Sequence, residues 1–240
     1  MDTTQTMTQN NKFNLLKDSV RSAFPHTIPV LTGFLVLGMA YGVLMQSKGY
    51  GVLWAVLMSA IAYCGSMQFV AVTLLTTVFN PVQAFFLSLM VNARHLFYGL
   101  SMLEKYKGLG KIRFFLIYTL TDETFSIASS ITPPADVDRK LFYCCISFLN
   151  YVYWVTGTFL GGLIGSKITF NTKGLDFVLT ALFVVLFIEQ MKYRELRRFG
   201  LAGITGALIG LIVFGAENMM IPSMVIILLI LLAGRKKQCI

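Results

Sequence analysis

Charged side chains lie inside two apolar stretches of the sequence, where each of them needs a partner. Arg94 and His95 stand in "VNARHLFYGL" (91–100), and Asp122 and Glu123 stand in "TLTDETFS" (119–126). On insertion scales, a charge at the centre of a membrane helix costs about 2.5–3.5 kcal/mol. The planar fork of an arginine suits a carboxylate in two-point contact. These residue types therefore predict an ion pair between Arg94 and one of the two acidic residues.

The sequence leaves the partner and the purpose of this pair open. Asp122 and Glu123 are neighbours, so on a helix their side chains point about 100° apart and only one of them faces Arg94. The pair is either purely structural or faces a water-filled cavity, where it meets a substrate or a coupling ion. An unperturbed histidine titrates near neutral pH, so His95 is either a proton relay or a structural hydrogen-bond donor. Asn92 adds a polar group nearby, and two distant histidines without clustered carboxylates predict no metal and no cofactor.

A third polar feature, "AYCGSMQF" (62–69), interrupts a long apolar run with Gly65, Ser66 and Gln68. A Gly-Ser pair in the middle of a helix favours a break. The half-helix that starts there presents free N–H groups and a positive dipole end to an anion. Broken helices near the midplane hold substrate groups in many transporters. The alternative is a simple kink or a packing patch of small residues.

The elements that position these residues follow from the composition. Hydrophobic residues make up 56% of the 240 positions and charged residues 13%, against about 25% charged in soluble domains. The fold class is therefore an all-α membrane protein, a polytopic bundle of seven or eight transmembrane helices with a broken helix near Gly65 and Ser66. We expect a cytoplasmic segment with an interfacial amphipathic helix at 1–26, a single transmembrane domain at 27–234, and a basic tail at 235–240. The apolar segments are 27–46, 51–79, 81–103, 112–131, 141–165, 176–191, 201–215 and 219–233.

The net charge of +9 comes from short basic clusters between apolar segments. Such clusters are typical of loops retained in the cytoplasm and argue against nucleic-acid binding. With eight crossings, the clusters favour an N-terminus inside. The four basic residues in 105–113 fit poorly, because that loop would then lie outside. A re-entrant or half-crossing segment would remove this conflict.

Glycines recur at four-residue spacing on three of the apolar segments, which predicts close helix packing. "GMAYGVLMQSK" (38–48) and "GTFLGGLIGSK" (157–167) also match each other at five positions, about half the chain length apart, as in a duplicated transporter fold. The spaced glycines are Gly38, Gly42, Gly157, Gly161, Gly206 and Gly210.

As a set and in this order, five motifs resemble the AzlC family of branched-chain amino-acid export proteins. They are "GMAYG" (38–42), "YCGSMQF" (63–69), "NARHLFYGLSM" (92–102), "TDETFS" (121–126) and "NYVYWVTGTFLGG" (150–162). The resemblance implies the large subunit of a two-component exporter of leucine, isoleucine and valine, driven by the proton gradient. It also implies a small AzlD-type membrane subunit as partner and a place in the bacterial cytoplasmic membrane, embedded in the lipid bilayer.

Physical position then suggests roles for individual residues. The substrate carboxylate is expected at the Gly65–Ser66 break, at Arg94, or at both, and the amine at Asp122 or Glu123. One carboxylate, together with His95, would couple transport to protons. The alternatives are a transporter of another small solute, an intramembrane enzyme or a scaffold without transport. The expected substrate-binding residues are Gly65, Ser66, Gln68, Phe69, Asn92, Arg94, Phe97 and Tyr98.

Overall fold

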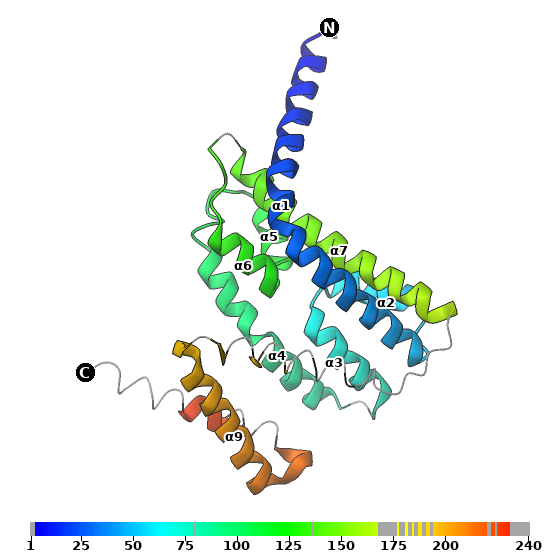
Figure 1. Cartoon of the computed structure of the whole chain (residues 1–240), viewed down its shortest axis with the longest axis vertical. Helices are drawn as coiled ribbons and strands as arrows, with labels where there is room; N and C mark the ends of the chain where they lie inside the picture. The colour runs from blue at the N-terminus through cyan, green and yellow to red at the C-terminus, as the bar shows by residue number, and fades with distance from the viewer. Residues whose placement is uncertain are drawn as a thin grey trace, which may run out of the picture. The chain divides into compact units, whose positions relative to one another are not determined.

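The computed structural model is all-helical in the parts that it describes, which are residues 3–78, 80–135, 137–167, 177, 181, 184, 187, 188, 191, 192, 194–219, 222, 223 and 225–230. The chain divides into two compact units, Met1–Asp176 and Phe177–Ile240. The helices, labelled in Figure 1, are α1 (Thr3–Ser47), α2 (Val52–Ile61), α3 (Gly65–Thr76), α4 (Pro81–Met102), α5 (Ile112–Tyr118), α6 (Asp122–Ser130), α7 (Arg139–Lys167) and α9 (Arg194–Asn218).

The described residues form helices and no strands, which confirms the all-α class. Several of these helices are also long enough to cross a membrane. Leu15–Ser47 within α1 and Arg197–Gly215 within α9 also meet a hydropathy criterion for a span. The 22 residues of α4 and the 29 of α7 extend about 33 and 43 Å. Seven or eight crossings and the boundaries at 26 and 234 stay predictions. The tail 235–240 lies outside the described residues, as do parts of the segments expected at 176–191 and 219–233.

Helix α1 joins two elements that the sequence analysis separates. The interfacial helix expected before residue 26 and the first apolar segment are one continuous helix. It contains Pro25 and Pro29, each of which removes a backbone donor and favours a bend. Figure 1 shows α1 changing direction along its length.

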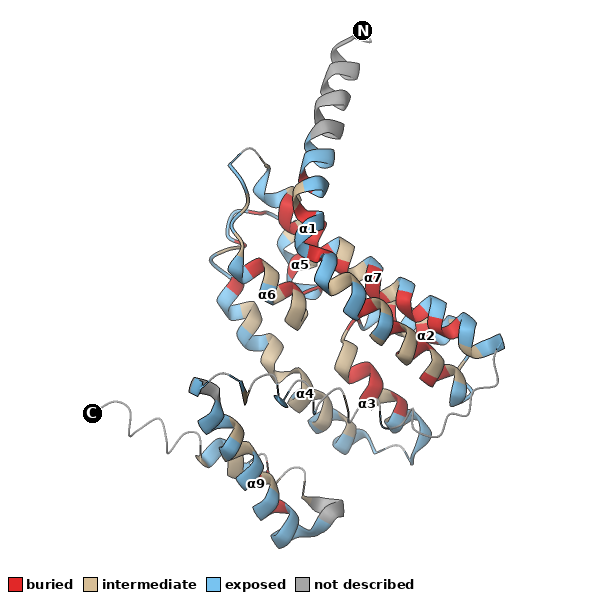
Figure 2. Cartoon of the chain, in the orientation of Figure 1, coloured by how far each residue is buried: buried red, intermediate tan, exposed pale blue. Residues whose placement is uncertain are grey.

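Helices α1 and α7 pack along each other and run in the same direction. His26 lies against Phe142 near the start of both helices, with ring centroids 6.2 Å apart. Further along, a Cβ on Gly165 would come 3.1 Å from Gln46, near the end of both. Buried residues line the facing sides of the two helices (Figure 2).

The glycines of these two helices allow their backbones to touch, as the spacing predicts. A Cβ on Gly42 would lie 2.3 Å from the Thr158 carbonyl oxygen, and one on Gly161 would lie 2.1 Å from that of Met39. Gly38 faces Gly157, so the two matching sequence segments pack against each other. In the second unit, Gly206 and Gly210 have the same role: their Cβ atoms would meet side chains of Ile227 and Ser223.

The apolar segment expected at 51–79 is a hairpin of two short helices, α2 and α3. Helix α2 ends at Ile61 and α3 begins at Gly65, which confirms the predicted break. Between them, Tyr63 has a φ of +40°, a left-handed conformation that a non-glycine residue seldom adopts. The far end of α3 returns to the start of α2, because the Tyr50 hydroxyl donates to the Leu75 carbonyl over 3.0 Å.

The segment expected at 112–131 is also a broken helix, and here the sequence analysis was wrong. Helix α5 ends at Tyr118 and α6 begins at Asp122, so the two acidic residues lie in a first helical turn and not in mid-helix. The Thr121 hydroxyl caps this turn by accepting from the Thr124 amide, and acidic residues are favourable at a positive dipole end.

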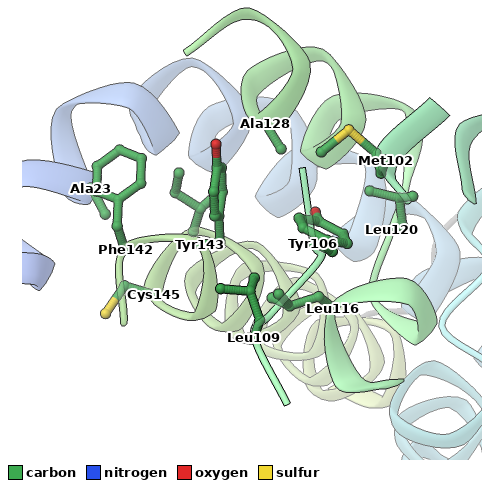
Figure 3. Close-up of a cluster of buried hydrophobic side chains, with 11 residues drawn as sticks. Ala23, Met102, Tyr106, Leu109, Leu116, Leu120, Ala128, Phe142, Tyr143 and Cys145 are labelled. Atoms are coloured by element: carbon green, nitrogen blue, oxygen red, sulfur yellow. The ribbon is translucent and has the colours of Figure 1, made fainter. Parts of the chain in front are cut away.

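Both ends of the α5–α6 hairpin lie beside the start of α7. A buried cluster joins Tyr106 and Leu116 to Phe142 and Tyr143 (Figure 3). At the other end of the hairpin, the Lys105 ammonium donates to the carbonyls of Ala128 and Ser129 in the last turn of α6. Arg139, the first residue of α7, donates to the Lys105 carbonyl.

Candidate functional site

Arg94 on α4 connects the two helix breaks. Its Nη1 atom lies 2.6 Å from Asp122 Oδ2, and its Nη2 atom donates to Ser66 Oγ over 2.8 Å. Asp122 is the first residue of α6 and Ser66 the second of α3. The predicted ion pair is therefore present, and its acidic partner is Asp122. The side chains are 31% and 29% exposed, so the pair lies where a small solute can reach it.

The local charge distribution around this pair favours an anion. Two half-helices, α3 and α6, begin here, and each contributes a partial positive charge at its N-terminal end. The side chain of Cys64, the N-cap residue of α3, accepts no hydrogen bond from the first turn. The buried Arg94 Nε atom has no hydrogen-bond partner among the described residues. Asp122 pairs with Arg94, and Glu123 lies beside it in the first turn of α6, whereas the first turn of α3 has no acidic residue, so the donors of α3 can serve a further carboxylate.

Aromatic and polar residues of α4 lie next to the pair. The Tyr98 ring stacks on Phe125 of α6 with centroids 4.4 Å apart, and its hydroxyl interacts with the Asp122 carboxylate. His95 Nδ1 lies 3.3 Å from the Asn92 carbonyl oxygen, on the same helix. Phe97 is 69% exposed within this unit. The roles of His95, Asn92, Tyr98 and Phe97 in transport stay predictions.

Gln68 belongs to a buried hydrogen-bond network that holds the first break. Its Nε2 atom donates to Ser59 Oγ over 2.8 Å, and its Oε1 atom accepts from Trp154 Nε1 over 2.9 Å. The Ser59 hydroxyl also lies 2.8 Å from that of Thr158. The network joins α2, α3 and α7, and both ends of the amide are used. This geometry favours a structural role for Gln68, while its contact with substrate stays a prediction.

Phe69 is also buried, at 1% exposure, with its ring against Tyr41 at a centroid distance of 5.6 Å. Gly65, in contrast, is partly exposed and lies against the Trp154 ring, where a Cβ would make ordinary contact at 3.5 Å. Phe69 therefore packs α3 against α1 on the buried side of the break, whereas Gly65 and Ser66 lie on its partly exposed side.

Two tyrosines that the sequence analysis missed donate hydrogen bonds to the last backbone carbonyl groups of α2. The Tyr118 hydroxyl lies 2.6 Å from the Ile61 carbonyl oxygen and 3.0 Å from that of Ala60. The Tyr151 hydroxyl donates to Ala60 over 2.8 Å. The last carbonyls of a helix have no intrahelical amide partner, so these hydroxyls replace the missing donors. Tyr118 is itself the last residue of α5, and it joins the two breaks directly.

The first turn of α6 is fixed to α7 by a buried amide that was also missed. Asn150 Nδ2 donates to Thr124 Oγ1 over 3.0 Å, and both residues are fully buried. Glu123, the next residue of α6, forms no ion pair with Arg94 in the described part of the chain, although it lies close enough to interact electrostatically with Arg94 and Asp122. Among the described residues, no group of three His, Cys, Asp or Glu side chains could hold a metal ion.

Comparison with known proteins identifies the family of this helical arrangement. The model of the "AzlC protein" family matches residues 29–168, more than half of the chain. The chain belongs to the AzlC family. The match covers residues 29–47 of α1 and all of α2 to α7, the helices that build the site around Arg94.

Individual relatives of the AzlC family agree with this assignment. The chain is 48% identical to the branched-chain amino acid transport protein AzlC of Bacillus subtilis, over 95% of this chain and 90% of that protein. It is 39% identical to a membrane protein of Haemophilus influenzae, over 93% and 92% of the two chains. It is 26% identical to the inner membrane protein YgaZ of Escherichia coli, over 78% and 79%. No solved structure matches the chain.

Proposed function

We propose that this protein exports branched-chain amino acids, namely leucine, isoleucine and valine, across the bacterial cytoplasmic membrane. It acts as a multi-pass secondary transporter driven by the proton gradient. It is the large subunit of a two-component system with a small AzlD-type membrane protein. Membership of the AzlC family and the name of the Bacillus subtilis relative support the substrate class.

The observation that carries the proposal is the ion pair of Arg94 and Asp122 between two helix N-termini. An amino acid is a zwitterion, and a charge left alone in a low-dielectric site is costly. A zwitterion can enter the pair with its carboxylate on Arg94 and its ammonium on Asp122, so that no charge loses its partner. The first turn of α3, whose N-cap side chain accepts no hydrogen bond, provides further contacts for the carboxylate.

Proton coupling follows from competition at Asp122. A proton on this carboxylate removes the charge that holds the substrate ammonium, so proton and substrate exclude each other. In this cycle the site binds a proton outside and releases it inside, and it binds substrate inside and releases it outside. Each cycle therefore exchanges proton for substrate. An inward proton gradient then drives export.

A leucine release assay tests the function. Cells without their own leucine exporters are loaded with a leucine-containing dipeptide, and external leucine is followed over time. Four strains contain this chain alone, a small AzlD-type subunit alone, both, or neither. We expect faster release only with both proteins. Unchanged release with both verified in the membrane contradicts the substrate assignment, and a panel of other small solutes then replaces leucine.

A further inference from the structure

We propose that the α2–α3 and α5–α6 hairpins enter the membrane from opposite faces, stop halfway and form the two gates of the Arg94 site. The arrangement of the hairpins follows from contacts within the first unit. Only their action as gates rests on the proposed transport function.

The parallel helices α1 and α7 give the first unit two distinct ends. The near end is the level at which Ala23 of α1 and Phe142 of α7 lie, close to the start of both helices. The far end is the level of Gln46 and Gly165, close to where both helices finish. Each hairpin can be assigned to one end by the residues that it contacts.

The α2–α3 hairpin begins and finishes at the far end. At its start, a Cβ on Gly162 of α7 would come 3.1 Å from Val52, the first residue of α2. At its finish, Leu75 in the last turn of α3 accepts the hydrogen bond of Tyr50. Tyr50 in turn donates its amide to Met45 in the last turns of α1.

The α5–α6 hairpin begins and finishes at the near end. Before α5, the Tyr106 ring lies against that of Tyr143 with centroids 5.7 Å apart, and Leu109 belongs to the buried cluster that contains Ala23 and Phe142 (Figure 3). After α6, the Ile131 carbonyl accepts from the Tyr143 hydroxyl over 3.4 Å. Met102, the last residue of α4, lies in the same cluster, so α4 runs from the far end to the near end.

The two hairpin tips meet halfway along α7. Tyr118 at the tip of one hairpin contacts Ala60 and Ile61 at the tip of the other, and Tyr151 of α7 contacts the same carbonyl of Ala60. The four half-helices have 10, 12, 7 and 9 residues, so each extends about 10 to 18 Å. None of them crosses about 30 Å of hydrocarbon alone.

The basic residues identify the near end as cytoplasmic. It carries the loop 105–113, whose four basic residues lie outside when both hairpins are treated as full crossings. With two hairpins, that loop joins the other basic residues at the near end, and Lys48 and Lys167 lie at the far end. This distribution satisfies the positive-inside rule. The near-end set is Lys17, Arg21, Lys105, Lys107, Lys111, Arg113, Arg139 and Lys140.

Each gate holds half of the site. Ser66 comes from the hairpin of the outer face, Asp122 from that of the inner face, and Arg94 binds both. A movement of the α2–α3 tip breaks the bond to Ser66 and opens the site outward. A movement of the α5–α6 tip breaks the bond to Asp122 and opens it inward. Separate elements for the two faces are the physical requirement of alternating access.

Cysteine labelling in intact cells tests the arrangement without any transport measurement. The full chain is expressed with the small subunit, with Cys64, Cys144, Cys145 and Cys239 replaced by alanine. Single cysteines are introduced by Val78→Cys, after α3, and by Lys107→Cys, after α4; both native side chains are exposed. Ser166→Cys and Ala135→Cys are controls, because hairpins and full crossings place them on the same faces, outside and inside.

With two hairpins, a membrane-impermeant maleimide labels positions 78 and 166 in intact cells, and it labels 107 and 135 only after permeabilisation. If both segments instead cross the membrane fully, position 107 is labelled in intact cells and position 78 only after permeabilisation, while 135 and 166 behave as before. That result overturns the proposal. An epitope inserted after Lys107 in the chain with native cysteines gives a second readout if the cysteine-free chain does not accumulate. Antibody binding to this epitope in intact cells would also overturn it.

Discussion

Arg94 of α4 and Asp122 of α6 form an ion pair, with 2.6 Å between Nη1 and Oδ2, and the same guanidinium donates to Ser66 of α3. One side chain thus holds three helices at the point where two of them begin. This arrangement explains why the chain tolerates a guanidinium among apolar residues. It also makes the shape of the guanidinium, and not only its charge, necessary for the site.

The first prediction separates shape from charge. Arg94→Lys keeps the positive charge but replaces two nitrogen donors, one for Asp122 and one for Ser66, by a single ammonium, so we expect one charge-assisted hydrogen bond to be lost. Such a bond is worth about 1.5–3 kcal/mol, and we expect leucine release to fall by at least about tenfold at equal protein level. Arg113→Lys is the matched control, because Arg113 lies on α5 over the Phe114 ring. Equal release by the two variants contradicts the role of Arg94.

The second prediction concerns the proton. Asp122→Asn cannot take up a proton and also loses the charge that binds the substrate ammonium, so leucine release should fall and lowering the external pH should no longer accelerate what remains. The titratable and charged groups near Asp122 are Arg94, His95, Tyr98 and Glu123, and none of them takes the place of its carboxylate in the ion pair with Arg94. Asp138→Asn is the control, since Asp138 caps the start of α7 outside the site. Release by Asp122→Asn that still responds fully to external pH would show that the proton binds elsewhere.

The third prediction tests the contact of α1 with α7. Gly42→Ala places a Cβ 2.3 Å from the Thr158 carbonyl oxygen, and the two backbones must separate. Overpacking of this kind costs roughly 1–3 kcal/mol, so the Tm of the purified protein should fall by several degrees. Gly33→Ala on the same helix meets nothing within 4 Å and should leave the Tm unchanged or raise it slightly. Similar Tm values for the two variants contradict the close contact.

How far the sequence predicts the site depends on the residue types at each break. Glycine and serine at 65–66 disfavour a helix interior, so the first break is visible in the sequence. The second break has no glycine or proline. Its signal is Thr121 followed by two acidic residues, the pattern of a helix start, which was instead interpreted as the middle of a helix. The choice of Asp122 over Glu123 depends on where α6 begins, and so the sequence analysis left it open.

Contacts between distant segments could not be predicted from local patterns. Tyr118 and Tyr151 cap the end of α2 only because the two hairpin tips meet. Similarly, Ser59, Trp154 and Thr158 look like ordinary members of apolar helices until the fold brings them to Gln68. Such residues carry no mark in the sequence, since hydroxyl and indole groups in apolar segments have many other uses.

The fourth prediction distinguishes two roles of Gln68. Gln68→Ala leaves the buried Trp154 Nε1 without an acceptor and removes the donor to Ser59, which costs roughly 1–3 kcal/mol. A structural role predicts a lower Tm, with an unchanged KM for leucine in the fraction that remains folded. Contact with substrate predicts a higher KM. Gln83→Ala, at an exposed position of α4, should change neither quantity.

The last prediction concerns Tyr118 as the link between the two gates. Tyr118→Phe removes the hydroxyl that lies 2.6 Å from the Ile61 carbonyl oxygen, while the Tyr151 hydroxyl still donates a hydrogen bond to the Ala60 carbonyl. A single neutral hydrogen bond contributes about 0.5–1.5 kcal/mol, so separated tips should become roughly 2- to 10-fold more populated. Cys64 lies at the tip of the α2–α3 hairpin and is partly exposed. It can report the separation when it is the one cysteine left in the chain.

We therefore expect Cys64 to react with a small maleimide about 2- to 10-fold faster in Tyr118→Phe than in the parent chain. Tyr153→Phe is the matched control, because the Tyr153 hydroxyl bonds to Thr27 between α1 and α7 and does not touch the tips. Equal labelling rates in Tyr118→Phe and the parent would show that the hydroxyl does not hold the tips together. Equal acceleration by both variants would indicate general loosening of the helices, and Tyr118 would then have no special part in gating.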